Sequence, residues 1–292
     1  DIRRRNEGAM KTVARILKSI ETIPAFPATG SKVARLLGRV DYSVPEVANV
    51  IRLDPSITAN ILKMANSAYF GSAHPIGTIQ DAVMYLGQKN LLLAIQTAGI
   101  SKYYKKGASG YFDKATDLWE HSVAVALMSQ ILSKAITGEE DTTLYTAALL
   151  HDVGKIILGE FVRDELYKIT LLVSRHGLSF LEAEETVLGI NHAELGGKIA
   201  EHWIFPSVIG DAIAFHHRPD LLEKKDQILP WLVYLADEAC LMMGMGSPVE
   251  GLAQRAVGQV LTKFNLRMKD LEKSMVLLSD DLSKARDLIN II

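Results

Sequence analysis

Cysteine is nearly absent from this chain: Cys240 is the single one among 292 residues. One cysteine excludes an internal disulfide and is typical of the reducing cytoplasm, where we expect the protein to work. Cys240 itself is interpreted as a small buried side chain in a helix. Long apolar runs are absent as well. None approaches the roughly 18 residues that a membrane-spanning helix requires, so we expect no membrane span.

The chain also lacks a marked excess of charge of either sign. Lys and Arg together number 32, against 34 Asp and Glu, and no long basic run interrupts the sequence. Proteins that bind nucleic acid or anionic membranes need a basic surface, so we expect neither partner. The remaining composition, 48% hydrophobic and 23% charged, is that of an ordinary globular protein.

Strand-type alternation of apolar and polar residues is nearly absent, whereas helical spacing recurs along the chain. Start signals for helices are clear: Ser43 opens a capping box, and Asp54 precedes a proline at a first helical position. The polar, glycine-bearing stretch 105–110 is the best domain boundary. The sequence therefore predicts an all-α protein, with an N-terminal helical bundle over residues 1–108 packed on a second helical bundle over residues 109–292.

Two residues of the kind that bind metals stand at the end of one apolar run. His151 and Asp152 follow Ala-Ala-Leu-Leu, within a helix that we predict over residues 142–158. An unpaired buried charge is costly, so this doublet requires a metal, or a salt bridge that imitates one. A neutral imidazole beside a carboxylate is a suitable pair of ligands for a divalent cation.

Further histidines and one aspartate have similar apolar surroundings in the second half of the chain. A predicted helix over residues 116–135 carries the first histidine, a helix opened by Pro206 runs to a His-His pair, and a helix over residues 229–243 carries the aspartate. Inward faces of helical bundles are where metal sites are built. Together with the doublet, the candidate ligands are His121, His151, Asp152, His192, His216, His217 and Asp237.

This set of imidazoles and carboxylates suits Fe or Mn best, with Zn, Ni and Mg as further candidates. If the Asp152 carboxylate bridges, the site holds two ions about 3.5–4 Å apart, and otherwise one. Each residue also has an ordinary interpretation. A single buried histidine usually bonds a carbonyl, Asp237 alone suits a salt bridge, and histidines at a helix end interact favourably with the macrodipole. We keep such ordinary roles for His74, His176 and His202.

A known pattern unites the candidate ligands. The second half resembles the HD superfamily of metal-dependent phosphohydrolases, in which a first histidine, a His-Asp doublet and a late aspartate hold the metal. Here these are His121, His151, Asp152 and Asp237. The whole chain is more similar to the HDOD family, a signalling relative. The motifs that carry this resemblance cover residues 20–240 approximately, and they are 23–27, 54–70, 81–87, 191–196, Trp203, Pro206 and 216–219.

The resemblance implies an N-terminal helical bundle joined to an HD-like bundle, in a bacterial signal-transduction setting with a signalling protein partner or a small effector. HDOD members are generally not shown to be enzymes. In the related HD-GYP cyclic-dinucleotide phosphodiesterases, additional histidines follow the doublet, and His192, His216 and His217 match them in order. Lys155 matches a lysine that faces the substrate phosphate there, although its ordinary interpretation is a solvated lysine at a helix end. The Gly-Tyr-Pro motif is missing after His217.

Two functions are consistent with these residues. In the first, the chain is a signal-transduction module of the HDOD type, without enzymatic activity, that retains an HD-type metal site. In the alternative, it is a metal-dependent phosphohydrolase or phosphodiesterase acting through a metal-bound water, with Lys155 contacting the phosphate. We expect the first function, because the resemblance to a signalling family extends along the chain and the Gly-Tyr-Pro motif is missing.

Overall fold

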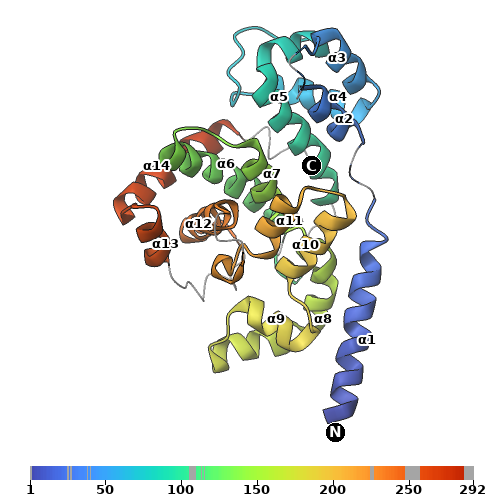
Figure 1. Cartoon of the computed structure of the whole chain (residues 1–292), viewed down its shortest axis with the longest axis vertical. Helices are drawn as coiled ribbons and strands as arrows, with labels where there is room; N and C mark the ends of the chain where they lie inside the picture. Colours follow the sequence, from blue (N-terminus) through green and yellow to red (C-terminus); the bar gives the residue numbers. More distant parts are fainter. Residues whose placement is uncertain are drawn as a thin grey trace. The chain divides into compact units, whose positions relative to one another are not determined.

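The computed structural model describes residues 2–24, 26, 28–37, 39, 41–104, 110–112, 114, 116–223, 227–246 and 257–285. In these ranges the regular secondary structure consists of helices, labelled α1 to α14 with a short 3₁₀ helix η1, and contains no strand (Figure 1). The all-α prediction is confirmed. Among the described helices, none combines the length and the apolar character needed to cross a membrane.

The chain divides into two compact units. The large unit comprises Asp1–Pro24 and Lys106–Leu277, and the small unit comprises Ala25–Lys105 and Leu278–Ile292. Helix α1 (Ile2–Ile20) is grouped with the large unit because it packs against α8 (Lys155–His176), α9 (Phe180–Leu188) and α10 (His192–His202). The sequence prediction instead placed these N-terminal residues in a bundle over residues 1–108. Its predicted boundary at 105–110 lies mostly outside the described residues.

Helices of the small unit begin where the sequence signals them. They are α2 (Ala28–Leu37), α3 (Val44–Arg52), α4 (Pro55–Ala65) and α5 (Ile79–Tyr104). The Ser43 hydroxyl accepts a hydrogen bond from the Glu46 N–H at the start of α3, and the Asp54 carboxylate accepts two at the start of α4. Each such cap contributes about 1 kcal/mol. These local signals explain why the predicted helix starts are confirmed.

Glycine and asparagine shape the connection between α4 and α5 and the course of α5. Gly87 interrupts α5 with φ 66° and ψ 178°, a conformation that glycine adopts at little cost. Asn66 organises the preceding loop, since its amide donates to the Leu62 and Ile76 carbonyls and accepts from the Ile76 N–H. Asn66 therefore has a structural role.

The core of the large unit lies around two buried helices. Helix α6 (Asp117–Thr137) packs against α7 (Thr142–Leu150) and α12 (Leu229–Met242). Residues 144–150 of α7 are all buried. Full burial of one leucine or valine side chain stabilises the fold by about 2 kcal/mol. The buried side chains of α6 and α7 therefore contribute much of the stability of the unit. The remaining elements are α11 (Ser207–Ala214), η1 (Pro219–Leu221), α13 (Val257–Lys263) and α14 (Met268–Lys284).

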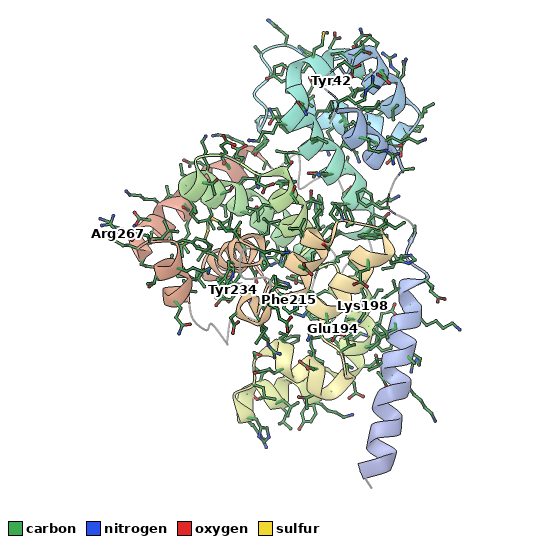
Figure 2. The ribbon with its side chains drawn as sticks, in the orientation of Figure 1. Tyr42, Glu194, Lys198, Phe215, Tyr234 and Arg267 are labelled. Atoms are coloured by element: carbon green, nitrogen blue, oxygen red, sulfur yellow. The ribbon has the colours of Figure 1, made fainter. Side chains whose placement is uncertain are left out.

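Helix α10 is exposed on one side and tied to the rest of the unit at its end. Glu194 and Lys198 lie on its outer face, where their charged atoms are 3.5 Å apart (Figure 2). The inner face packs against α11. Trp203 follows the last turn, and its indole N–H donates to the Pro24 carbonyl over 3.1 Å. Pro24 is the last residue of the first segment of the large unit, so the end of α10 holds that segment.

The His-Asp doublet does not lie inside a helix, which corrects the sequence prediction. Instead of one helix over residues 142–158, α7 ends at Leu150 and α8 begins at Lys155. Hydrogen bonds between residues three apart form the turn that joins them. Gly154 lets this turn press against α10, because a Cβ there would lie 2.0 Å from the His192 carbonyl oxygen. This contact between distant segments is invisible to helical periodicity.

Replacing Gly154 with alanine should lower the free energy of unfolding by about 3 kcal/mol, because the added Cβ meets backbone atoms that cannot rotate away. Chemical denaturation measures the loss. Gly210→Ala is the matched control, since a Cβ there has its nearest neighbours at 3.9 and 4.0 Å. Alanine in a helix is favoured over glycine by about 0.5–1 kcal/mol, so the control should not destabilise. Equal stability of the two variants would contradict the close contact.

Candidate metal centre

All of the predicted ligands lie in the described part of the large unit, and they meet in its interior. Three of them lie on helices: His121 on α6, His192 at the start of α10, and Asp237 on α12. The others follow helix ends. His151 and Asp152 come directly after α7, and the His-His pair follows α11, although the sequence predicted helices that include them.

The early end of α11 is what brings both members of the pair to the centre. Ala214 is the last helical residue, and the Phe215 N–H closes the helix on the Asp211 carbonyl. Neighbouring residues of a continuous helix point about 100° apart, so both could not face one site. After the helix ends, the rings of His216 and His217 lie with centroids 4.0 Å apart. The prediction of a helix reaching these residues was therefore wrong.

The ligands form two adjoining groups, within each of which the ligand atoms lie within 4.8 Å of one another. One group is Asp152, His192, His216 and His217, and the other is His121, His151 and Asp237. His217 is half-buried, and the others are at most 3% exposed. The histidines for which we kept ordinary roles are all exposed, namely His74, His176 and His202.

Asp152 faces both groups with different oxygen atoms. Its Oδ1 lies 3.5 Å from Nε2 of His192 and 3.8 Å from Nε2 of His216. Its Oδ2 lies 3.3 Å from Nε2 of His151 and 3.6 Å from Nε2 of His121. The carboxylate thus stands between the two groups, as a bridging ligand would.

The Nδ1 atoms orient the buried histidines. Nδ1 lies 2.7 Å from a backbone carbonyl oxygen three residues earlier in both His151 and His216, and 3.0 Å from the Met245 carbonyl in His121. A carbonyl only accepts, so in the neutral ring Nδ1 carries the proton and Nε2 keeps its lone pair. In His192, Nδ1 donates to the Glu184 carboxylate over 2.7 Å with the same result. Each Nε2 atom is thereby prepared to bind a cation.

Glu184 is the residue of this site that the sequence analysis missed. It is fully buried on α9, and its Oε2 accepts both the backbone N–H of His192, over 2.9 Å, and the ring Nδ1–H. Its Oε1 accepts the hydroxyl of Tyr111. Carboxylates in this position fix the tautomer of a metal-binding histidine and raise its basicity. The sequence carries little signal, because Glu182 and Glu185 flank Glu184 and periodicity does not say which of them is buried.

Negative charge exceeds fixed positive charge in the centre. Lys155 donates to Asp152 over 2.6 Å and is 1% exposed. Burial opposes ionisation of Asp152, but the charges of His151 and Lys155 hold its pKa well below the usual value. Burial likewise opposes ionisation of Asp237, yet the close approach of His121, whose Nε2 lies 3.1 Å from Oδ1, leaves its pKa lowered. Two ionised aspartates therefore lie beside one lysine and beside histidines whose protons a bound cation would displace.

The histidines respond to this environment in two ways. Burial and the neighbouring imidazoles lower the pKa of His216 well below its usual value and that of His217 to about 3. Burial also acts against protonation of His151 and His192, but the charges of Asp152 and Glu184 respectively leave their pKa values raised. Nε2 of His217 lies 2.9 Å from Nε2 of His192, so at most one proton lies between these two atoms.

These residues fit a divalent metal ion. Several ligand atoms are buried without a well-directed hydrogen bond among the described residues, namely Nε2 of His121, His151 and His216 and Oδ1 of Asp152. Buried polar atoms nearly always have a partner, so a convergent set without one indicates an ion site. Imidazole nitrogens with carboxylate oxygens suit Fe, Mn or Zn. The large unit thus contains a buried His-Asp cluster that can hold a metal.

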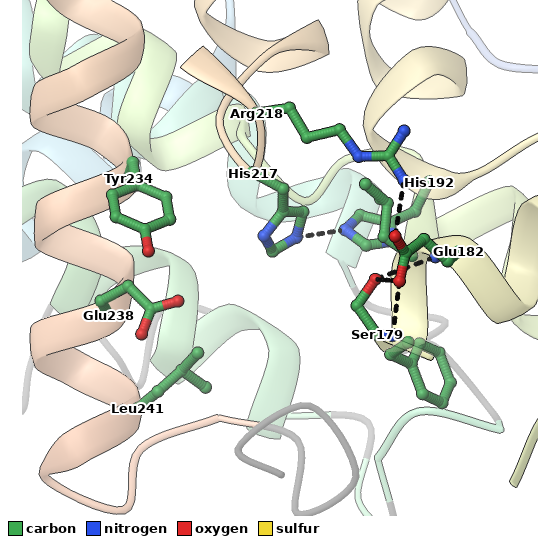
Figure 3. Close-up of a pocket in the computed structure, with 10 residues that line it drawn as sticks. Ser179, Glu182, His192, His217, Arg218, Tyr234, Glu238 and Leu241 are labelled. Carbon is green, nitrogen blue, oxygen red and sulfur yellow. Dashed lines mark hydrogen bonds and ion pairs between the residues drawn. The ribbon is translucent and has the colours of Figure 1, made fainter. Parts of the chain in front are cut away.

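A cavity of about 160 Å³ adjoins the cluster (Figure 3). Tyr234 and Glu238 project from α12 on one side, and His217 and Arg218 face them from the other. Burial, and then the charge of Asp237, raises the pKa of Glu238 to about 8. The cavity therefore combines a carboxyl group on one wall with cluster residues on the other.

In metal-free protein, stability should fall as the pH drops below 6.5. His217 has its pKa lowered from 6.5 to about 3, and His216 shifts in the same direction, so the unfolded chain binds protons that the folded chain does not. Linkage gives a loss of about 1.4 kcal/mol per pH unit for each such histidine. His151 and His192 have raised pKa values, so they oppose this slope near pH 6.5, where the unfolded chain is half-protonated, and stop contributing about one pH unit lower, where both states are protonated. Urea denaturation after chelation measures the loss.

The variant His217→Gln should flatten this pH dependence by the contribution of about one proton. His176→Gln is its control, because His176 is exposed at the end of α8, and it should leave the dependence unchanged. Stability that stays constant or rises as the pH falls from 6.5 would contradict the neutral state of His216 and His217.

Comparison with known proteins places this arrangement in a family. The chain is 28% identical to an HDOD domain protein of unknown function from Geobacter sulfurreducens, and the match covers 95% of this chain and 96% of that structure with a TM-score of 0.71. The structure of an inferred phosphohydrolase from Shewanella amazonensis SB2B is 22% identical, and the match covers 94% of this chain and 97% of that chain with a TM-score of 0.70. At this identity the match shows a similar fold and nothing more.

A curated relative gives a partial match. An uncharacterised protein of Treponema pallidum (strain Nichols) is 24% identical over 209 residues, which is 71% of this chain, and the matched region spans 40% of that protein's length. The family model for the HDOD domain matches residues 23–219. This match covers well over half of the chain, and the chain therefore belongs to the HDOD family.

Proposed function

We propose that this protein is a metal-containing regulatory module in bacterial signal transduction, and that it does not turn over a substrate. In this proposal the cluster in the large unit binds a divalent metal, and a small effector or a signalling protein partner responds to the state of that unit. The proposal of a metal rests on one observation. In every buried histidine of the cluster Nδ1 makes a hydrogen bond, which leaves each Nε2 directed to the centre.

We further propose that the metal is Fe or Mn and that two ions can bind. The donor set of imidazoles and carboxylates without a thiolate supports this choice. The two oxygens of Asp152, which face separate groups of histidines, support a bridging role and hence the second ion. Bound metal would stabilise the fold by compensating the buried aspartates, and it would supply Lewis-acid character to any ligand in the cavity.

The surroundings of Lys155 support a regulatory rather than a catalytic role. Its ammonium group is held by Asp152 at 2.6 Å and lies 5.4 and 5.7 Å from the ring centroids of Tyr111 and Phe112. It is 1% exposed, so a phosphate would have to displace these contacts to reach it. The adjoining cavity of about 160 Å³ is also smaller than the roughly 300–1,000 Å³ of sites for drug-sized ligands.

Protein purified anaerobically should contain about one or two divalent ions per chain by elemental analysis. His216→Ala should lower the metal content well below one per chain, because it removes a ligand atom without leaving a buried charge unpaired. His176→Ala is the control, since that exposed histidine lies outside the cluster, and it should retain the full content. Absence of metal from the parent protein, or equal content in both variants, would remove the metal from the proposal.

A graded effect is expected from Glu184→Gln. This change keeps the size of the side chain, but it removes the charge that orients His192 and raises its basicity. Loss of such a supporting carboxylate typically weakens metal binding by about 10–100-fold. Competition with a chromogenic chelator measures the affinity. Glu194→Gln, on the exposed face of α10, is the matched control.

A second candidate function is metal-dependent phosphoester hydrolysis. The observation that favours it is the cavity, which brings His192, His217 and the Arg218 guanidinium to one wall. Metal-loaded protein should nevertheless show no more turnover on a panel of phosphomonoesters and phosphodiesters than His216→Ala does. Turnover that requires both the metal and His216 would replace the regulatory proposal with the enzymatic one.

A further inference from the structure

The cavity beside the cluster contains a buried polar atom that the metal ligands do not use. Oε2 of Glu238 has no hydrogen bond among the described residues, and the residue is 6% exposed. Glu238 shares one face of α12 with Tyr234 and Leu241, at helical spacings of four and three residues. A buried carboxyl oxygen without a donor is costly. This wall of the cavity therefore calls for a ligand that donates a hydrogen bond.

The opposite wall carries a cation. Arg218 lies across the cavity from Glu238, on the side of His217 (Figure 3). Its guanidinium nitrogens are 3.9 Å from Glu182 and 3.6 Å from Glu185, and its side chain is 35% exposed. These contacts are longer than the 2.7–2.9 Å of a strong charge-assisted hydrogen bond. The fork of donors can therefore accommodate a ligand carboxylate.

The size and the apolar part of the cavity restrict its ligand. A volume of about 160 Å³ is too small for a nucleotide, given the roughly 300–1,000 Å³ of sites for drug-sized ligands. Phe180, Leu181 and Leu241 provide apolar surface between the two charged walls. A molecule that satisfies all of these features is small and has an amino group, a carboxylate and a short side chain.

We propose that this cavity binds a free α-amino acid. The ammonium group donates to Glu238, the carboxylate accepts from Arg218, and the side chain packs on Phe180 and Leu241. This inference rests on the proposed regulatory function, because it names the class of small effector to which the module responds. Glu238 follows Asp237 on α12, and Arg218 follows His217, so the ligand contacts neighbours of both groups of the cluster.

Isothermal titration of the full chain with each standard amino acid tests the proposal. The titrations use protein loaded with Mn²⁺ and, separately, protein stripped by a chelator. At least one amino acid should bind, and Glu238→Gln should weaken it about tenfold or more, since an amide cannot ionise when the ligand ammonium group arrives. Arg218→Gln should weaken it similarly, and this half-exposed position does not threaten folding. Glu194→Gln, with its glutamate on the outer face of α10, should leave the affinity unchanged (Figure 2).

Single-group probes separate this ligand from its alternatives. Propylamine has only the amino group and propionate only the carboxylate, so each should bind much more weakly than the amino acid. Inorganic phosphate or propionate binding as tightly as the best amino acid would overturn the proposal, as would an affinity that Glu238→Gln leaves unchanged. Metal uptake without binding of any amino acid would overturn it while the metal proposal stands. Amino-acid binding through Glu238 in protein that takes up no metal would support the amino-acid proposal and contradict the metal proposal.

Discussion

The buried carboxylate of Asp152 is the group on which the arrangement of the large unit depends. It is 1% exposed, has Lys155 at 2.6 Å, and has imidazole nitrogens of the cluster at 3.3 to 3.8 Å. A charge this deeply buried is tolerated only when its neighbours compensate it. Helices α6 and α10 and the segments after α7 and α11 must therefore converge on one point. The interior of the unit is organised by a charge as well as by apolar packing.

The histidines around this charge are held by two different means. Backbone carbonyls orient His121, His151 and His216, so their directions follow from the path of the chain itself. His192 is oriented by a side chain, Glu184, whose other oxygen accepts from Tyr111. A carbonyl cannot be changed by a substitution, whereas a glutamate can. His192, which also lines the cavity, is therefore the ligand whose affinity is most readily tuned.

Local signals were readable from the sequence, and contacts between helices were not. The cap at Asp54 involves neighbouring residues and was predicted, because capping is a property of a few consecutive residues. His121 and Asp237 were candidates from their apolar helical surroundings, and a family pattern then linked them to the doublet. The turn at Gly154 depends on a carbonyl of a distant helix, and the burial of Glu184 depends on how α9 packs. Periodicity describes each helix alone, so it could not anticipate either.

Helix α10 connects the cluster to the segment that leads out of the large unit. His192 opens the helix, and Trp203, directly after its eleven residues, holds the Pro24 carbonyl. Such a helix is about 16 Å long and moves as a rigid rod. A tilt of this helix at His192 would therefore displace its far end, where Trp203 contacts Pro24 and the chain passes into the small unit.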